Sequence, residues 1–228
     1  MRDEVSQLTK VPFILSVVAG STDIIGFLAL NGLFTAHITG NIVVLAAHIV
    51  VGDPTVFSYV LSVPVFMLVL LLTRVLAAVL ERAGLSTLFP LLLLQLLFLV
   101  AFLVLGVTAG PWKDGDTALA VLAGMLGIAA MAVQNALVQI SLKHSATTAV
   151  MTTNVTHFML DLGEVLVGRD QAEIAKARRS VMHTLPVIFG FVLGCALGAA
   201  CEAAAGLWSL ALPSGLALVA CVLGLRSV

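Results

Sequence analysis

Long apolar runs separated by short polar stretches dominate the pattern of the chain. A helix that crosses the hydrocarbon core of a bilayer needs about 20 predominantly apolar residues. Segments of this kind lie at residues 11–33, 57–80, 87–109, 117–140, 181–205 and 207–226. Two shorter and more polar segments follow the first and the fourth of these, at residues 34–51 and 148–168. The pattern predicts an all-α fold, a polytopic transmembrane helical bundle.

The two short segments decide how often the chain crosses the membrane. There are eight crossings if both of them span, and six if both are broken or re-entrant. Cytoplasmic loops collect Lys and Arg. With six crossings and the N-terminus inside, all 11 basic residues except Lys113 lie at inner ends. These inner residues are Arg2, Lys10, Arg74, Arg82, Lys143, Arg169, Lys176, Arg178, Arg179 and Arg226. Eight crossings would move Arg74, Arg82 and Lys143 outside, so we expect six crossings with two re-entrant segments.

Polar positions recur in the same order in the two halves of the chain. In the first half, Ser21-Thr22-Asp23 lies in a long segment and Ile38-Thr39-Gly40-Asn41 opens the short one. In the second half, Val133-Gln134-Asn135 and Val155-Thr156-His157-Phe158 hold these places. Three crossings per half make the halves antiparallel, an inverted repeat of the kind found in transporters. We therefore expect a single transmembrane domain at 1–228, with repeats at approximately 11–109 and 117–226.

The composition narrows the class of protein. Hydrophobic residues make up 61% of the chain and charged residues 10%, whereas a soluble domain is nearer a quarter charged. The net charge is -1 and basic blocks are short, so we expect a lipid bilayer and no nucleic acid as partner. The polar start leads into an apolar run longer than the core of a cleaved signal sequence. This favours a retained helix and a bacterial inner membrane location.

Asp23 is a carboxyl group midway along the first long segment. A charged side chain at the centre of a bilayer costs about 2.5–3.5 kcal/mol on insertion scales, so its presence needs a reason. Two interpretations stay open: a proton- or cation-coupling group, or a structural carboxylate bonded to neighbouring helix ends or hydroxyls. Asp161 in the second short segment is the other candidate for ion coupling. Gln134 and Asn135 suit contact with a polar substrate or with an Asp partner, and equally suit hydrogen bonds between helices.

Both short segments carry hydroxyl and amide side chains near their start. Gly40 and Asn41 tolerate backbone angles that break a helix, and Thr39 and Asn41 can cap the half-helix that follows. A buried half-helix N-terminus presents N–H groups and a positive dipole end to a carboxylate or another polar group. The pattern indicates either a substrate or ion site or two capped structural turns. In the second segment the corresponding residues are Thr152, Thr153, Asn154, Thr156 and His157, and His37, His48 and Glu164 extend the polar zone.

Other motifs add little chemistry. The sequence has no HExxH, CxxC, GxSxG or Walker pattern, so we expect no metal, no cofactor and no enzymatic activity. The three cysteines lie in apolar segments and are expected to be packing residues. Small residues every four positions let helices approach closely, either within the fold or across a homodimer. Such a stripe is formed by Gly190, Gly194 and Gly198.

Two stretches resemble the signature regions of the YoaK family, also called DUF1275, of bacterial multi-pass membrane proteins. They are AGSTDIIGFLALNGLFTAHITGN at residues 19–41, and VQNALVQ at 133–139 together with TTNVTHF at 152–158. The resemblance covers nearly the whole chain. In the family, the second region usually carries a Thr-Gly pair, where this chain has Thr156-His157. The resemblance implies a multi-pass membrane protein of a group regarded as uncharacterised or as small-molecule transporters.

The repeat, the two polar breaks and the lone carboxylate together predict a secondary transporter of a small polar or anionic molecule, coupled to protons or other ions. The alternatives are a channel or facilitator and an intramembrane accessory or sensor protein. Without a nucleotide-binding pattern, the energy has to come from an ion gradient or from a partner protein. The predicted substrate-binding residues are Thr39, Gly40, Asn41, Gln134, Asn135, Thr153, Asn154, Thr156 and His157.

Overall fold

The computed structural model describes residues 10–53, 56–112, 115–142 and 145–225, and every regular element within these ranges is a helix. The elements are α2 (Lys10–Ala29), α3 (Ile38–Val51), α4 (Phe57–Arg82), α5 (Leu88–Ala109), α6 (Ala118–Ser141), α7 (Met151–Val167), α8 (Gln171–Ala205), the 3-10 helix η1 (Gly206–Leu210) and α9 (Ala211–Leu225). Five helical stretches are long and apolar enough to cross a membrane. The all-helical membrane fold expected from the apolar runs is therefore confirmed.

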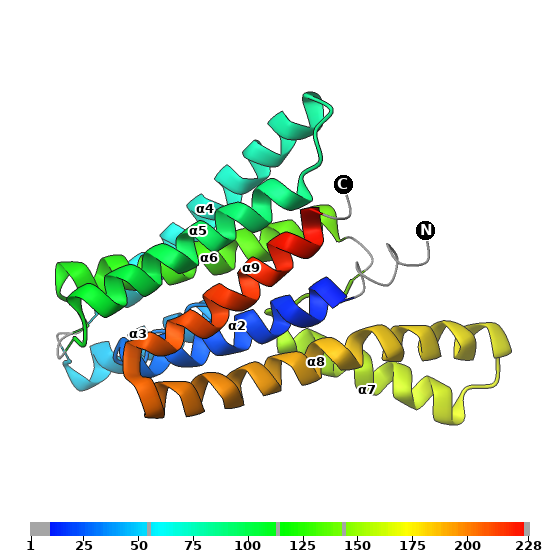
Figure 1. The fold of residues 1–228 in the computed structure, drawn as a ribbon. Coiled ribbons are helices and arrows are strands. Elements are labelled where there is room, and N and C mark those ends of the chain that lie inside the picture. Colours follow the sequence, from blue (N-terminus) through cyan, green and yellow to red (C-terminus); the bar gives the residue numbers. More distant parts are fainter. Residues whose placement is uncertain (1–9, 54–55, 113–114, 143–144, 226–228) are drawn as a thin grey trace.

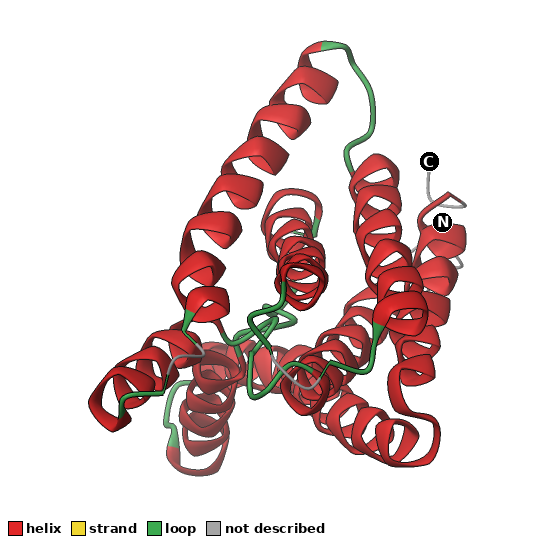
Figure 2. Cartoon of the chain, turned by 90° about the vertical axis from the view of Figure 1, so that its left-hand side faces the viewer, coloured by secondary structure: helices red, strands yellow, loops and turns green. Residues whose placement is uncertain are grey.

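The long helices lie side by side as one bundle. Helix α2 packs mainly against α8 and α9, α6 packs against α4 and α5, and α5 packs against α9. Figure 1 shows that α2 begins and α9 finishes at the same end of the bundle. Figure 2, turned by 90° from that view, shows one long helical hairpin whose tip stands apart from the other helices. This hairpin is α4–α5, and α4 is the least buried of the long helices.

Helix α8 starts ten residues before the predicted position, at Gln171 instead of 181. Asp170 is the N-cap residue, and its carboxylate accepts a hydrogen bond of 2.8 Å from the backbone N–H of Ala172. Glu173 adds an acidic side chain to the first turn, where it suits the positive end of the helix dipole. The criterion of apolar length counts only residues fit for lipid, and it therefore missed this polar beginning.

The stripe of small residues on α8 is a seam within the chain. Gly190, Gly194 and Gly198 are all buried. A Cβ added to Gly194 would lie 2.3 Å from the carbonyl oxygen of Val17, and one added to Gly190 would lie 2.2 Å from Oγ of Ser16. Both neighbours belong to α2. The interpretation as packing within the fold is therefore correct for this stripe. The other interpretation, a homodimer through the face of Gly190, Gly194 and Gly198, does not fit this packing, because α2 already covers that face.

Helices α3 and α7 both begin inside the bundle. Ala36, two residues before α3, and Ala149, two residues before α7, belong to one buried cluster. The cluster consists of Val18, Ala19, Ala36, Leu99, Ala130, Met131, Ala149, Phe191 and Ala217. From there α3 extends toward the end of the bundle where α2 finishes, and α7 extends toward the opposite end, where α8 begins (Figure 1). Each of the two then packs against the helix that follows it in the chain.

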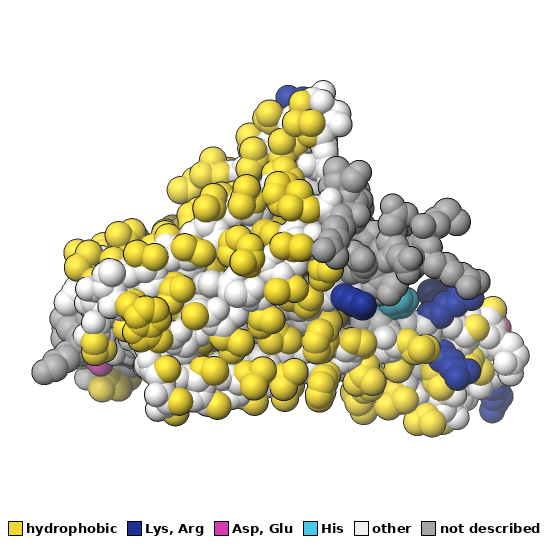
Figure 3. Space-filling view, in the orientation of Figure 1, with side chains coloured by type: hydrophobic (Ala, Val, Ile, Leu, Met, Phe, Trp, Pro, Cys, Tyr) yellow, Lys and Arg dark blue, Asp and Glu magenta, His cyan; other side chains and the backbone are white. Residues whose placement is uncertain are grey.

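Several basic residues gather at one end of the molecule. Lys10 begins α2, Arg82 ends α4, and Lys176 and Arg179 lie in the first turns of α8, and these three helix ends share one side of the bundle (Figure 1). The face shown in Figure 3 is mostly hydrophobic, with Lys and Arg confined to that side. The predictions for Arg2, Lys113, Lys143 and Arg226 concern positions outside the described residues.

Candidate functional site

Asp23 lies in the second half of α2 and binds the chain just before α3. Its side chain is buried, with 5% of the residue exposed. Oδ1 accepts hydrogen bonds from the backbone N–H groups of Ala36 at 2.7 Å and His37 at 3.4 Å. The hydroxyl of Thr35 also reaches Oδ1, at 3.5 Å. A buried carboxylate with several donors is strongly held, so the structural interpretation of Asp23 is realised here.

His37 joins this carboxylate to the surface of the protein. Its Nδ1 lies 2.6 Å from Oδ2 of Asp23, while 39% of the imidazole side chain is exposed. The ring packs edge-on against Phe34 and Phe191, with centroids 5.8 and 5.6 Å away. Imidazole exchanges protons near neutral pH. The pair therefore links a buried carboxyl group to a partly exposed imidazole.

Gln134 binds the loop before α7, much as Asp23 binds the loop before α3, but it carries no charge. Its Nε2 donates to Oγ1 of Thr148 at 2.8 Å, just before α7, and to the carbonyl oxygen of Leu15 at 2.9 Å. Its Oε1 accepts from Nε2 of Gln95 at 2.6 Å. The sequence analysis missed Gln95, although a single amide in the apolar run of α5 was a usable signal. The Oε1 atom of Gln95 is buried and has no hydrogen-bond partner within the described ranges.

Asn41 and Asn154 each fold a loop back onto the first turn of the helix that follows it. Asn41 accepts from the backbone N–H of Phe34 at 2.9 Å and donates to its carbonyl oxygen at 2.8 Å. Asn154 donates to the carbonyl oxygen of Thr147 and accepts from its hydroxyl group. Both bonds span seven residues. We call residues 34–41 the first junction and residues 147–154 the second junction.

The helix starts themselves differ from the prediction. The N-cap residues are His37 for α3 and Val150 for α7, and neither side chain caps its helix. Asn41, expected as a cap, holds the loop instead, and Thr39 is exposed. The first turns of both half-helices therefore lack a side-chain acceptor from their N-cap residue.

The hydrogen bonds of the two junctions also match one another. They align Thr35-Ala36 with Thr148-Ala149, and Asn41 with Asn154. The sequence analysis had matched Asn41 with Phe158, one helical turn further along. The two alignments differ because α7 carries threonines at both 152 and 156, four residues apart, so the Thr motif fits at two positions.

Several predicted residues contribute no side-chain hydrogen bond to the loops of these junctions. Thr153, Thr156 and His157 are exposed along α7, and Asp161 is partly exposed further along the same helix. The side chain of Asn135 donates to the carbonyl oxygen of Met131 in its own helix, and Gly40 packs against the ring of Phe34. Among the described residues, no group of three or more His, Cys, Asp or Glu could hold a metal ion.

Comparison with known proteins gives one match. A family model described as "Protein of unknown function (DUF1275)" matches residues 11–223 of the chain. No curated protein and no solved structure matches it.

Proposed function

We propose that this chain, which belongs to the DUF1275 family, is a secondary transporter of a small polar or anionic molecule in the bacterial inner membrane, coupled to protons or another ion. The observation that carries the proposal is the pair of half-helices that start at one buried cluster and leave toward opposite ends. Irregular backbone at membrane depth is tolerated where it is buried in protein or lines a cavity. Transporters use such interrupted segments, one per repeat, to form the substrate site.

The packing of the helices supports an inverted repeat of residues 11–109 and 117–226. In this arrangement α2 and α6 are equivalent, as are α4 and α8, and α5 and α9. The pairs α2·α8 and α6·α4 then correspond, and so do α2·α9 and α6·α5, while α5 packs on α9. These helices would make six crossings, with α3 and α7 re-entrant. The stretch Gln171–Leu225 holds two of these crossings, because the chain reverses its direction between α8 and α9 (Figure 1).

The positions of the basic residues support an orientation of the chain in the membrane. Under the positive-inside rule, the end that holds the basic starts of α2 and α8 faces the cytoplasm. The first junction then enters from the outer side and the second from the cytoplasmic side. Alternating access can proceed by moving one repeat against the other around the site where the junctions meet.

In the proposed mechanism, the substrate lies against the starts of α3 and α7. The N–H groups and positive dipole ends there attract an anionic or polar group. Asp23 and His37 supply the coupling. A proton that reaches Asp23 through His37 removes the negative charge that strengthens the hydrogen bonds to Ala36 and His37. The first junction is then held less tightly, which links protonation to the opening of one side.

The test begins with a search for the substrate. Purified protein in detergent is screened by thermal shift, because a ligand that binds the folded state raises its stability. The ligand found is then used, in labelled form, with protein reconstituted in liposomes. We expect accumulation driven by a proton gradient, and exchange of labelled for unlabelled substrate without one.

Asp23→Asn and Asp161→Asn separate the roles of the two candidate carboxyl groups. Asp23→Asn is expected to retain exchange and lose gradient-driven accumulation, while Asp161→Asn keeps both activities. Equilibration without accumulation by the unmodified protein would identify a facilitator instead. Unchanged accumulation by Asp23→Asn would remove Asp23 from the coupling mechanism.

A further inference from the structure

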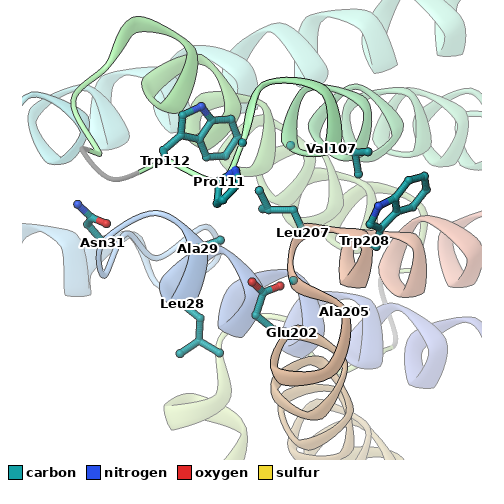
Figure 4. Close-up of a pocket in the computed structure, with 13 residues that line it drawn as sticks. Leu28, Ala29, Asn31, Val107, Pro111, Trp112, Glu202, Ala205, Leu207 and Trp208 are labelled. Carbon is teal, nitrogen blue, oxygen red and sulfur yellow. The ribbon is translucent and has the colours of Figure 1, made fainter.

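A cavity of about 410 Å³ opens at the end of the bundle opposite to the basic helix ends. It lies between the ends of α2, α5 and α8, the residues that follow α5, and η1 (Figure 4). Its lining includes Asn31, Trp112, Glu202 and Trp208. None of its lining residues belongs to the junctions, to Asp23 or to Gln134, so it is separate from the site of the proposed transport function.

Glu202 is the charged residue in the described lining of this cavity. Its Oε2 accepts a hydrogen bond from Oγ of Ser209. The ion pairs formed among the described residues join other side chains and leave Glu202 without a cationic partner. In Figure 4 the carboxylate points away from α8 into the space between Ala29 and Leu207.

The position of Glu202 in its helix is unfavourable for a carboxylate. The residue lies in the last turn of α8, which ends at Ala205. The C-terminal end of a helix carries the negative end of the dipole, which repels an acidic side chain. A bound cation would offset this repulsion more fully than the hydrogen bond from the neutral hydroxyl of Ser209.

Aromatic side chains complete the site. The chain contains two tryptophans, and both line this cavity from different elements. Trp112 lies on one side of the Glu202 carboxylate and Trp208 on another (Figure 4). Tryptophan is enriched where a protein meets the membrane interface, but that preference does not account for a carboxylate without a cationic partner in the same cavity. Indole rings also attract organic cations.

We propose that this cavity binds a small organic cation, with its ammonium group against Glu202 and its apolar part against the tryptophans. The inference goes beyond the proposed transport function, since it concerns a different part of the molecule. It also does not depend on that function, because binding is measured without transport.

The intrinsic fluorescence of the protein provides the measurement, because all of its tryptophan signal comes from this cavity. Full-length protein in a non-ionic detergent is titrated with tetramethylammonium chloride, with sodium chloride at equal ionic strength, and with tert-butanol as an uncharged molecule of similar shape. We expect a saturable change in emission with tetramethylammonium alone. The absence of a saturable change, or the same response to all three solutes, would overturn the proposal.

Glu202→Gln tests the role of the charge. It is expected to weaken tetramethylammonium binding about tenfold or more, because a partly buried ion pair is lost. Glu81→Gln makes the same charge change on an exposed residue at the end of α4 and is expected to leave the affinity unchanged. Unaltered affinity in folded Glu202→Gln protein would refute the site.

Should Glu202→Gln fail to fold, as judged by gel filtration, Glu202→Asp replaces it. The shorter carboxylate keeps the charge, so selectivity over tert-butanol persists while the affinity falls. If the affinity and the selectivity of Glu202→Asp both stayed unchanged, residue 202 would not contact the cation.

An ammonium group can come from a free solute or from a lipid headgroup. The titration is therefore repeated in nanodiscs of pure phosphatidylglycerol and in nanodiscs that also contain phosphatidylethanolamine. Competition by phosphatidylethanolamine would assign the cavity to a lipid headgroup, and equal affinity in both would assign it to a free cation. Absence of tetramethylammonium binding in both kinds of nanodisc would overturn the site in a bilayer.

Discussion

The two junctions share a backbone design and differ in the group that holds them. In both, a buried Thr-Ala pair precedes the half-helix, and an Asn bonds seven residues back. The first junction is held by the carboxylate of Asp23, and the second by the amide of Gln134. A carboxylate changes its charge with protonation, whereas an amide does not. A fold with two similar junctions therefore places its titratable group in one of them.

The difference extends to the N-cap residues. His37 reaches from Asp23 to the surface, while Val150 occupies the matching place in the second junction and is 47% exposed. The first junction thus contains a buried carboxyl group bonded to a partly exposed imidazole. The second has a chain of neutral amides, Gln95 and Gln134, buried in the bundle. The two junctions therefore differ in chemistry, with an ionisable pair in the first and neutral amides in the second.

Asp23→Ala should have the largest effect on stability. It leaves the buried N–H groups of Ala36 and His37 without their acceptor, and we expect a loss of about 3–5 kcal/mol in the free energy of unfolding. Unfolding in mixed micelles, followed by circular dichroism, provides the measurement. Asp161→Ala is the control and should cost about 0.5 kcal/mol or less, because Asp161 is partly exposed. Similar losses in both variants would contradict the role given to Asp23.

Gln134→Leu should cost less than Asp23→Ala, about 2 kcal/mol. It removes three neutral hydrogen bonds, to Gln95, Thr148 and Leu15, and each such bond contributes about 0.6 kcal/mol in a membrane. The same unfolding experiment compares the two variants directly. Gln139→Leu, on an exposed position of α6, controls for the change of residue type. A larger loss for Gln134→Leu than for Asp23→Ala would reverse the comparison.

Asn41→Ala and Asn154→Ala should have nearly equal effects, about 1 kcal/mol each. Both remove two hydrogen bonds to a residue seven positions earlier. Measuring the two variants in parallel tests the register that pairs these residues. Phe158→Ala serves as the comparison, because the sequence analysis matched Asn41 with Phe158. If it matched Asn41→Ala while Asn154→Ala had no effect, that pairing would fail.

His37→Ala should have the smallest effect on stability, about 0.5–1 kcal/mol, because the imidazole is half-exposed and Asp23 keeps its backbone donors. Its effect on gradient-driven accumulation should be much larger, since the route to Asp23 is removed. Val150→Ala, at the matching position, should leave accumulation unchanged. Equal accumulation in both variants would mean that protons reach Asp23 without His37.

The sequence predicts the helices well because a physical length determines them. Bilayer thickness requires apolar runs of about 20 residues, and the ends of α4, α5 and α6 lie within two residues of the prediction. The start of α8 was misplaced, because its first turns lie in a polar stretch to which the apolar criterion does not apply. The glycine stripe had two possible partners, and only the packing of α2 against α8 decides between them.

The site is harder to predict from sequence. Asp23, Gln134 and Asn41 were identified because polar groups in apolar segments need a reason. The junction residues that Asp23 and Gln134 bind lie 12 to 14 residues further along the chain, across a loop that no helical period describes. The sequence also could not show that Asn154 is buried whereas its polar neighbours on α7 are exposed. That distinction depends on which face of α7 packs against α8.

Helix α8 is much longer than the membrane that it is proposed to cross. Its 35 residues extend about 52 Å at 1.5 Å per residue, against a hydrocarbon core of about 30 Å. The surplus projects beyond the lipid at the basic end, with Lys176, Arg178 and Arg179 at the height of the headgroups or above. The inner leaflet is anionic and attracts such residues by about 1 kcal/mol each. In the proposed orientation, the basic start of α8 would therefore help to set the depth of the protein in the bilayer, and the tip of the α7–α8 hairpin would lie in the aqueous phase.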